Sequence, residues 1–281
     1  MIGSISESLY ADSPDELLYH YTTIKGFQGI IDNGYLWASD VRYMNDSAEL
    51  QYIVQLLRWK IEPNEKNALL LNQFADWIAN RITNGHMVFA ASFRANGNLL
   101  SQWRGYSRVG KGISIGFKGV DIKALAQHSE FKLGRCIYQR EQQELLIDRV
   151  ISSLLSMSQS FDLESDHSRE AFFKSIEVDI LRVAVLLKHP SFAEEDEWRI
   201  VSPVVTDYLS APVKFREGTS MLIPYYEFPL IKNSGVPVEH LFVGPTPNST
   251  LSLNSLRLYL RKKNILLGKE ITYCDIPYRN R

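Results

Sequence analysis

Glu194-Glu195-Asp196-Glu197-Trp198-Arg199-Ile200-Val201 is the stretch on which the organisation of this chain depends. Four consecutive acidic residues lead here into a segment with the composition of a β-strand. Because side chains alternate between the two faces of a strand, we expect Glu195, Glu197 and Arg199 to share one face. Two carboxylates beside a guanidinium favour acid, base or cation-stabilising chemistry. The alternative is an exposed acidic turn before an ordinary strand, with Arg199 paired to a neighbouring glutamate.

The composition of the chain limits its class. With 281 residues, 45% of them hydrophobic, it can bury a substantial core. The formal net charge of −1 gives no global positive field that would favour nucleic acid or an anionic membrane as a partner. Cys136, Cys274 and the histidines show no metal-ligand spacing, so no metal site is predicted. Cysteine usage of this kind is typical of a reducing compartment, and we expect a cytoplasmic protein without a signal peptide or membrane span.

Hydrophobic periodicity predicts secondary structure along most of the chain. A strand is expected over 17–21, then a helix that begins at Thr22 or Thr23 and ends at Asn33-Gly34. Further helices are expected over about 45–61, 66–82, 99–106 and 252–263, and further strands over 35–38, 87–93, 112–117, 198–204, 213–216, 221–226, 239–243 and 271–276. Helical spacing covers most of 141–189. We therefore predict a single α+β domain over 1–281 with a mainly helical insertion at about 140–190.

Two short motifs invite a functional interpretation. Gly112-Ile113-Ser114-Ile115-Gly116 matches the G-x-S-x-G nucleophile elbow, but the alternation around Ser114 indicates the interior of a strand, so we expect Ser114 to be inert. His20 lies near a strand end and just before a helix, where backbone amides can meet a phosphate. A lone histidine at such a place is more often a core residue with its hydrogen bonds satisfied.

Several strings occur in a characteristic order from about residue 17 to 245. They are Tyr19-His20-Tyr21-Thr22, residues 30–39, Met44-Asn45-Asp46-Ser47-Ala48-Glu49, Ala91-Ser92-Phe93, residues 100–106, residues 111–117, and Lys188-His189-Pro190 followed by residues 195–199. In this order they resemble the bacterial family known as domain of unknown function 2971. The family's usual Asn-Asp-Pro-x-Glu is Asn45-Asp46-Ser47-Ala48-Glu49 here, which keeps the polar residues and loses the proline.

That family is remotely similar to ADP-ribosyltransferase-like folds, so the resemblance implies a split-sheet core and NAD as the substrate. It assigns His20 to the first strand position of such sites, Ser92 or Tyr106 to the second, and Glu197 or Glu195 to the third. Breaking the nicotinamide–ribose bond produces an oxocarbenium-like cation, which a carboxylate stabilises. His20 would hold the other ribose, and Tyr21, Trp103 and Tyr106 are candidates to stack on the nicotinamide.

The short strands that carry these residues have no separate core to bury, so we expect them to assemble into one sheet region with a ligand cleft at the strand ends. His20, Ser92, Tyr106 and Glu197 are expected to line one cleft, with Trp103 or Tyr21 as a wall. Arg199 is expected to keep Glu195 ionised while Glu197 faces the ligand. A glutamine at position 197 is then expected to abolish NAD turnover and to leave the fold intact.

The function implied is an NAD-dependent ADP-ribosyltransferase-like enzyme, such as a toxin or phage-defence effector, with a protein or nucleic-acid acceptor and a neutralising partner. Two other classes stay open. One is a nucleotide-sensing module of the same fold that has lost catalysis. The other is a nucleic-acid-acting protein whose phosphate contacts come from Arg42, Arg94, Arg104, Arg108, Lys111 and Lys118, provided that these share a face.

Overall fold

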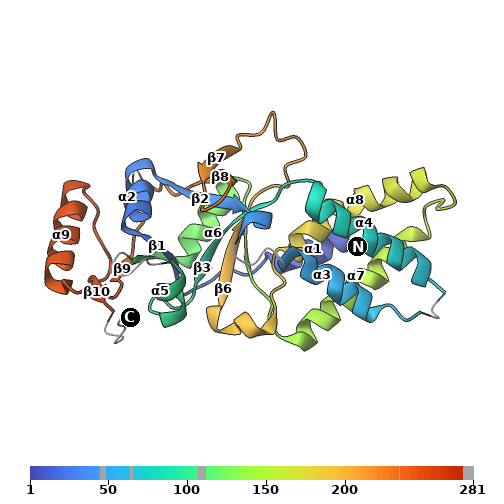
Figure 1. Ribbon diagram of the computed structural model, residues 1–281, viewed down its shortest axis with the longest axis horizontal. Coiled ribbons are helices and arrows are strands. Elements are labelled where there is room, and N and C mark those ends of the chain that lie inside the picture. Colours follow the sequence, from blue (N-terminus) through green and yellow to red (C-terminus); the bar gives the residue numbers. More distant parts are fainter. Residues whose placement is uncertain (45–48, 64–65, 107–111, 234, 275–281) are drawn as a thin grey trace.

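The computed structural model describes residues 1–44, 49–63, 66–106, 112–233 and 235–274 (Figure 1). In these residues ten strands form one mostly antiparallel sheet, in a mixed α+β protein. The main path runs β10-β9-β4-β1-β3-β2-β8-β7, and β6 joins β3 to β5. The strands are β1 (Leu17–Thr23), β2 (Tyr35–Asp40), β3 (Phe89–Arg94), β4 (Gly112–Lys118), β5 (Lys132–Arg135), β6 (Glu197–Val201), β7 (Lys214–Glu217), β8 (Leu222–Pro229), β9 (His240–Val243) and β10 (Thr272–Tyr273).

The sheet forks at β3. One edge of β3 pairs with β6 along its length, from Ala90 to Arg94. The other edge pairs with β2 at Phe89 and Ala90 and with β1 only at Arg94. Ser92 therefore lies where β1 and β2 separate from the same edge of β3.

Helices cover both faces of the sheet. The described helices are α1 (Ile2–Leu9), α2 (Ile24–Asn33), α3 (Glu49–Lys60), α4 (Ala68–Asn84), α5 (Leu100–Tyr106), α6 (Gly119–His128), α7 (Arg140–Ser158), α8 (Asp166–Ala184) and α9 (Ser249–Lys262), with short 3-10 helices η1 (Val41–Tyr43) and η2 (Pro190–Glu195). Side chains of α2, α6 and α9 share a core with Phe89, Ala91 and Phe93, which are alternate residues of β3. None of the described helices is long and apolar enough to cross a membrane.

The opposite face of the sheet carries two separate groups. The helical group of α1, α3, α4, α7 and α8 packs against Ala90 and Val201. Figure 1 shows this group gathered at one end of the molecule. Farther along the same face, α5 lies over β1, and its Trp103 packs with Tyr19 and Tyr21. The interval between the helical group and α5 is where the functional site is found.

The predicted ends of α2 are confirmed. The Thr23 hydroxyl accepts a hydrogen bond from the Gly26 amide over 3.1 Å, which caps the first turn. Gly34 ends the helix at φ 72°, in the left-handed region that glycine adopts without a steric cost. Thr23 and Gly34 thus set the reversals that bring β1 and β2 to the same edge of β3.

Two α-helices and one strand of the described residues were not predicted: α1, α6 and β5. Ile2 and Ile5 give α1 only a short apolar stripe, which is too brief to be recognised by period. The strand β5 has the sequence Lys-Leu-Gly-Arg, with low strand propensity, and it exists because it pairs with the buried strand β6. The helical part also contains α1, α3 and α4 in addition to the two helices, α7 and α8, that the prediction placed at about 140–190.

Candidate functional site

The site is built where β3 and β6 pair. Ser92 lies opposite Arg199, and Arg94 opposite Glu197, so the alternation of both strands places these four side chains on the face that carries α5. All five residues of β6 are buried. Burying a carboxylate and a guanidinium together requires that each be paired and hydrogen-bonded.

Glu197 is the centre of this cluster, and its side chain is 0% exposed. Its Oε1 accepts hydrogen bonds from the Ser92 hydroxyl and from Arg199 Nε, the latter over 2.7 Å. Its Oε2 accepts from Lys188 Nζ over 2.7 Å and lies 3.3 Å from Arg94 Nη1. Burial alone would raise the pKa of the Glu197 carboxyl, but the charges of Arg199, Arg94 and Lys188 outweigh it and hold that pKa well below its usual range.

Glu195 reaches the same cations from a different element. It is the last residue of η2, and Asp196 follows at φ 38°, in the left-handed region that Asp tolerates better than most residues. This reversal breaks the strand alternation expected from Glu195 to Arg199. The Glu195 Oε2 accepts from Lys188 Nζ at 2.5 Å and from Arg94 Nη2 at 3.1 Å. Its Oε1 has a long 3.5 Å hydrogen bond from Gln102, and the side chain is 18% exposed.

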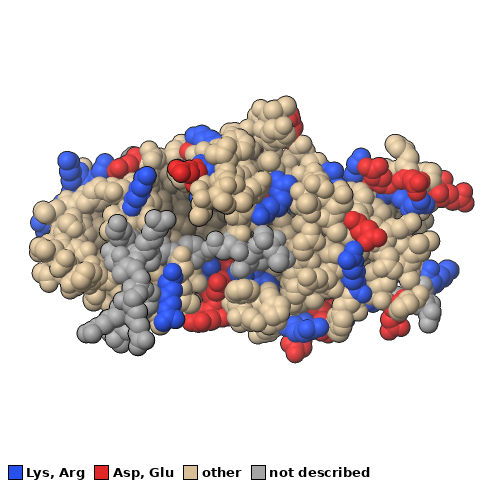
Figure 2. Space-filling view, viewed as in Figure 1, with Lys and Arg blue, Asp and Glu red and all other residues tan. Residues whose placement is uncertain are grey.

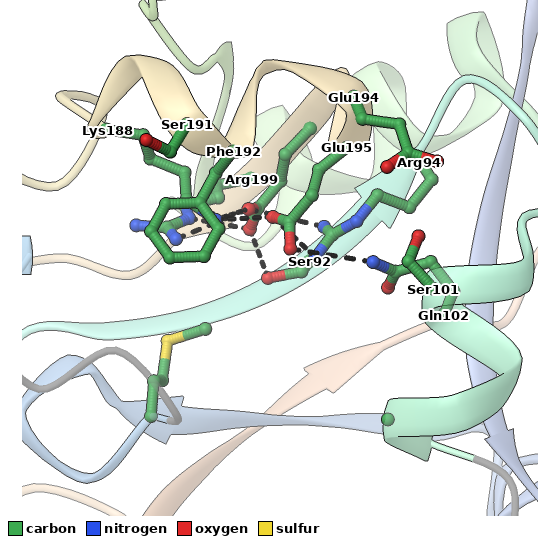
Figure 3. A pocket seen from close by; sticks show the side chains of 13 residues that line it. Ser92, Arg94, Ser101, Gln102, Lys188, Ser191, Phe192, Glu194, Glu195 and Arg199 are labelled. Atoms are coloured by element: carbon green, nitrogen blue, oxygen red, sulfur yellow. Dashed lines mark hydrogen bonds and ion pairs between the residues drawn. The ribbon is translucent and has the colours of Figure 1, made fainter.

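The two glutamates form the floor of a pocket of about 280 Å³. In Figure 3, Glu195 lies between Arg94 and Gln102 on one side and Lys188 and Phe192 on the other. The lining comes from five segments: β3, α5, η2 together with Lys188 two residues before it, β6, and the residue after η1. The lining residues are Met44, Ser92, Arg94, Ser101, Gln102, Gly105, Lys188, Ser191, Phe192, Glu194, Glu195, Glu197 and Arg199.

The structure brings together four of the residues predicted for the site: Ser92, Glu195, Glu197 and Arg199 all line this pocket. It exchanges the roles expected for the two acids, because Arg199 binds Glu197 and Glu195 is the carboxylate that remains partly exposed. Tyr106 was the other candidate for the second position, and its side chain lies outside the part of the chain that is described.

Tyr21 and Trp103 are core residues and do not line the pocket. Their rings meet edge to face at a centroid distance of 4.9 Å, and Trp103 is 1% exposed. The Trp103 indole N–H donates to Asn98, and the Tyr21 hydroxyl donates to the Asn96 carbonyl oxygen. The predicted aromatic wall is therefore wrong for these two residues. Among the described residues that line the pocket, the aromatic ring is that of Phe192, with Lys188 Nζ 5.1 Å from its centroid.

His20 lies on the opposite face of the sheet from the pocket. It pairs with Ile115 of β4, and its ring contacts Phe93 at a centroid distance of 6.0 Å, within the core under α2 and α6. Its Nδ1 donates to the Ser92 carbonyl oxygen over 3.0 Å, at the fork between β1 and β2. His20 thus donates a hydrogen bond to the backbone of Ser92 from the other side of the sheet. The prediction that His20, Ser92 and Glu197 line one cleft is wrong for His20.

The state of His20 makes a prediction about stability. Burial lowers the pKa of His20 to about 4, despite the hydrogen bond to Ser92, from an ordinary value of 6.5. As the pH falls, His20 is protonated in the unfolded chain at a higher pH than in the folded protein. The contribution of neutral His20 to the free energy of unfolding is therefore complete above pH 6.5 and is lost as the pH falls toward 4. Wild type should lose about 2 kcal/mol more than His20→Asn between pH 7 and pH 5 in urea denaturation. Equal losses in the two proteins would contradict a buried, neutral His20.

Lys188, Arg94, Gln102 and Phe192 were not predicted as site residues. Arg94 was considered only as a phosphate contact, and Lys188 only as part of a family string. Arg94 and Gln102 reach Glu195 from positions 101 and 93 residues away in the sequence, so no local pattern indicates them. Lys188 lies seven residues before Glu195 and Phe192 lies with Glu195 in η2, but this short 3-10 helix has no regular spacing that would indicate either as a site residue. The one available signal is energetic: a buried acidic pair on a strand requires more positive charge than Arg199 supplies.

Two other expectations can be compared with the structure. Ser114 is 0% exposed in the interior of β4, which confirms that it does not have the exposed strand-to-helix turn of a nucleophile elbow. Of the cations considered for nucleic-acid binding, Arg42 pairs with Asp40, Lys118 with Glu239, and Arg94 with Glu195 and Glu197. Arg108 and Lys111 lie outside the described residues. Positive and negative side chains are interspersed over the face in Figure 2, without a broad basic patch.

Comparison with known proteins gives one match. No curated protein matches the chain in sequence. Residues 102–200 match the family model described as "Protein of unknown function (DUF2971)", a shorter segment than the resemblance over 17–245 had suggested. The matched segment runs from α5 to β6 and contains Gln102, Lys188, Glu195, Glu197 and Arg199. Residues 102–200 of this chain are therefore a DUF2971 family domain.

Proposed function

We propose that the pocket binds the nicotinamide riboside part of NAD and that the protein transfers ADP-ribose to an acceptor, in the manner of ADP-ribosyltransferase-like enzymes. The observation that carries this proposal is the contrast between the two glutamates. Glu197 is enclosed by donors, whereas Glu195 presents one oxygen to the pocket that, among the described residues, accepts one long hydrogen bond. A carboxylate held in this way can face a cation that develops on a ribose.

The fork in the sheet supports the same proposal. Ser92 lies where β1 and β2 separate from β3, and it links His20 on one side to Glu197 on the other through its carbonyl and its hydroxyl. A histidine lies on a first strand, a serine on a later strand and a glutamate on a third. This is the order that the resemblance to split-sheet ADP-ribosyltransferase-like folds implies. In this chain, the linkage passes through the sheet instead of along one cleft.

The chemistry assigns a task to each group around the pocket. The bond between the nicotinamide nitrogen and the ribose anomeric carbon breaks, and its electron pair leaves with the nicotinamide, which becomes neutral. Glu195 stabilises the cationic ribose until the acceptor's nucleophile bonds to the anomeric carbon and transfers its proton to solvent water. Lys188 and Arg94 hold the Glu195 carboxylate in place, and the Phe192 ring at the pocket is a surface for the nicotinamide.

The proposal is tested by measuring nicotinamide release. Wild-type protein is incubated with NAD, with water as the default acceptor, and free nicotinamide is separated by chromatography. Release above a protein-free control, at a rate proportional to protein concentration, is the expected result. No release under conditions in which NAD binds would contradict the transferase function.

That second outcome corresponds to the one alternative that a specific observation favours. Three cations contact the two glutamates, and a site with so many ion pairs resists the rearrangements that catalysis requires. A pocket that binds NAD without cleaving it would be a nucleotide-sensing module. Binding measured by calorimetry, together with the absence of nicotinamide release, distinguishes this module from the enzyme.

A further inference from the structure

A second polar and aromatic surface adjoins the pocket on the same face of the sheet. Ser39 of β2 pairs with Ala90 of β3, and Ala90 precedes Ser92 by two residues, so Ser39 and Ser92 face the same side. Two residues of a strand span about 7 Å. Figure 1 shows β2, β8 and β7 side by side beyond β3, and Figure 2 shows the surface hollowed beside β2. A ligand in the pocket can therefore extend onto β2 without leaving this face.

Trp37 provides an open aromatic ring on this surface. It is two residues before Ser39, so it faces the same side, and it is 49% exposed. Its ring packs on Tyr225 of β8 at a centroid distance of 4.6 Å and an interplanar angle of 33°. Tyr225 lies opposite Ser39 in the register. A ring supported from one side and open on the other can stack a nucleobase.

Arg216 provides a positive charge without an acidic partner. From β7 it crosses β8 and donates from Nη2 to the Ser39 hydroxyl over 3.1 Å. Among the described residues it forms no ion pair, and its Nε is buried without a hydrogen-bond partner. Burial lowers the pKa of the Arg216 guanidinium, and the electrostatic interaction with Tyr225 opposes this shift without cancelling it. Its neighbour Lys214, by contrast, pairs with Glu227 at 2.8 Å.

We propose that this surface, formed by Trp37, Ser39, Arg216 and Tyr225, holds the adenosine diphosphate part of NAD; this inference rests on the function proposed above. The adenine stacks on Trp37, and the Arg216 guanidinium neutralises the pyrophosphate. Charge complementarity favours this occupant, because a partly buried guanidinium without a counter-charge gains most from an anion. The volume of the pocket agrees, since about 280 Å³ lies just below the usual range for ligand sites, so a whole dinucleotide would have to extend beyond the pocket.

The test uses ADP-ribose, which lacks nicotinamide, as the probe in isothermal titration calorimetry. Trp37→Ala and Arg216→Gln should each weaken binding by about tenfold or more, because each removes a stacking or a charge contact. Phe215→Ala is the matched control: Phe215 precedes Arg216 in β7, is 58% exposed and points to the other face of the sheet. Its dissociation constant should equal that of wild type.

The outcomes separate this inference from the proposed function. Binding of ADP-ribose that depends on Trp37 and Arg216, without nicotinamide release from NAD, supports the adenosine surface and contradicts the transferase. Nicotinamide release with an unchanged KM for NAD in Trp37→Ala and Arg216→Gln supports the transferase and overturns the adenosine surface. The inference is also overturned if wild type does not bind ADP-ribose, or if Phe215→Ala weakens binding as much as the two test variants.

Discussion

Replacing Glu197 with glutamine is expected to lower the free energy of unfolding by about 3–5 kcal/mol. The carboxylate is fully buried and contacts Arg94, Lys188 and Arg199. The amide keeps the shape but removes the negative charge, and it has one acceptor oxygen where the carboxylate had two. Each of three buried cations would then lose its ion pair with Glu197, which makes the loss larger than for an exposed ion pair.

Urea denaturation at pH 7 measures this loss. Glu194→Gln is the matched control, because it makes the same chemical change at an exposed position of the same segment and should alter stability by no more than about 0.5 kcal/mol. The sequence alone predicts an intact fold for Glu197→Gln, and the cation cluster reverses that expectation. Equal midpoints for the two variants would show that the charge of Glu197 is not needed for folding.

Glu195→Gln is expected to lower the rate of NAD cleavage by about 100-fold, which corresponds to about 3 kcal/mol of transition-state stabilisation. The reason is that Glu195 is the carboxylate with an oxygen directed into the pocket. Its fold should persist, because Lys188 and Arg94 keep their contacts with Glu197. Nicotinamide release at saturating NAD gives kcat, and circular dichroism checks the fold.

Glu194→Gln serves again as the control and should retain the wild-type kcat. Glu194 lines the mouth of the same pocket but is exposed, so a loss of rate shared by both variants would indicate a general effect of negative charge near the site. Full activity of Glu195→Gln would remove Glu195 from the proposed mechanism.

The elements that local signals define were predicted well. A threonine cap and a left-handed glycine limit α2, and both are residues whose physical chemistry acts within one turn. The strands β1, β3 and β4 are apolar runs of the expected length. The association of Ser92, Glu195, Glu197 and Arg199 was also recognised, since three of these lie within five residues and Ser92 followed from the resemblance.

The features that long-range register decides were not predicted. Whether His20 or Tyr21 lies on the side of the sheet that carries the pocket depends on which residue of β1 pairs with Arg94, and that residue is Tyr19. A shift of one residue would have exchanged the two faces. In the acidic motif, the left-handed Asp196 separates Glu195 from β6, a local break that strand alternation does not reveal. Arg94 comes from a strand 101 residues away from Glu195, and Lys188 reaches Glu195 across the short helix η2, so the position of each is set by the tertiary structure.

A crystal structure of the wild-type protein soaked with NAD tests the central claim most directly. The account predicts a ribose, in NAD or in its products, within about 3.5 Å of the Glu195 Oε1 atom, with the 3.5 Å hydrogen bond from Gln102 to that oxygen replaced by the ligand. NAD bound away from Glu195, or a pocket without ligand at saturating NAD, would contradict it.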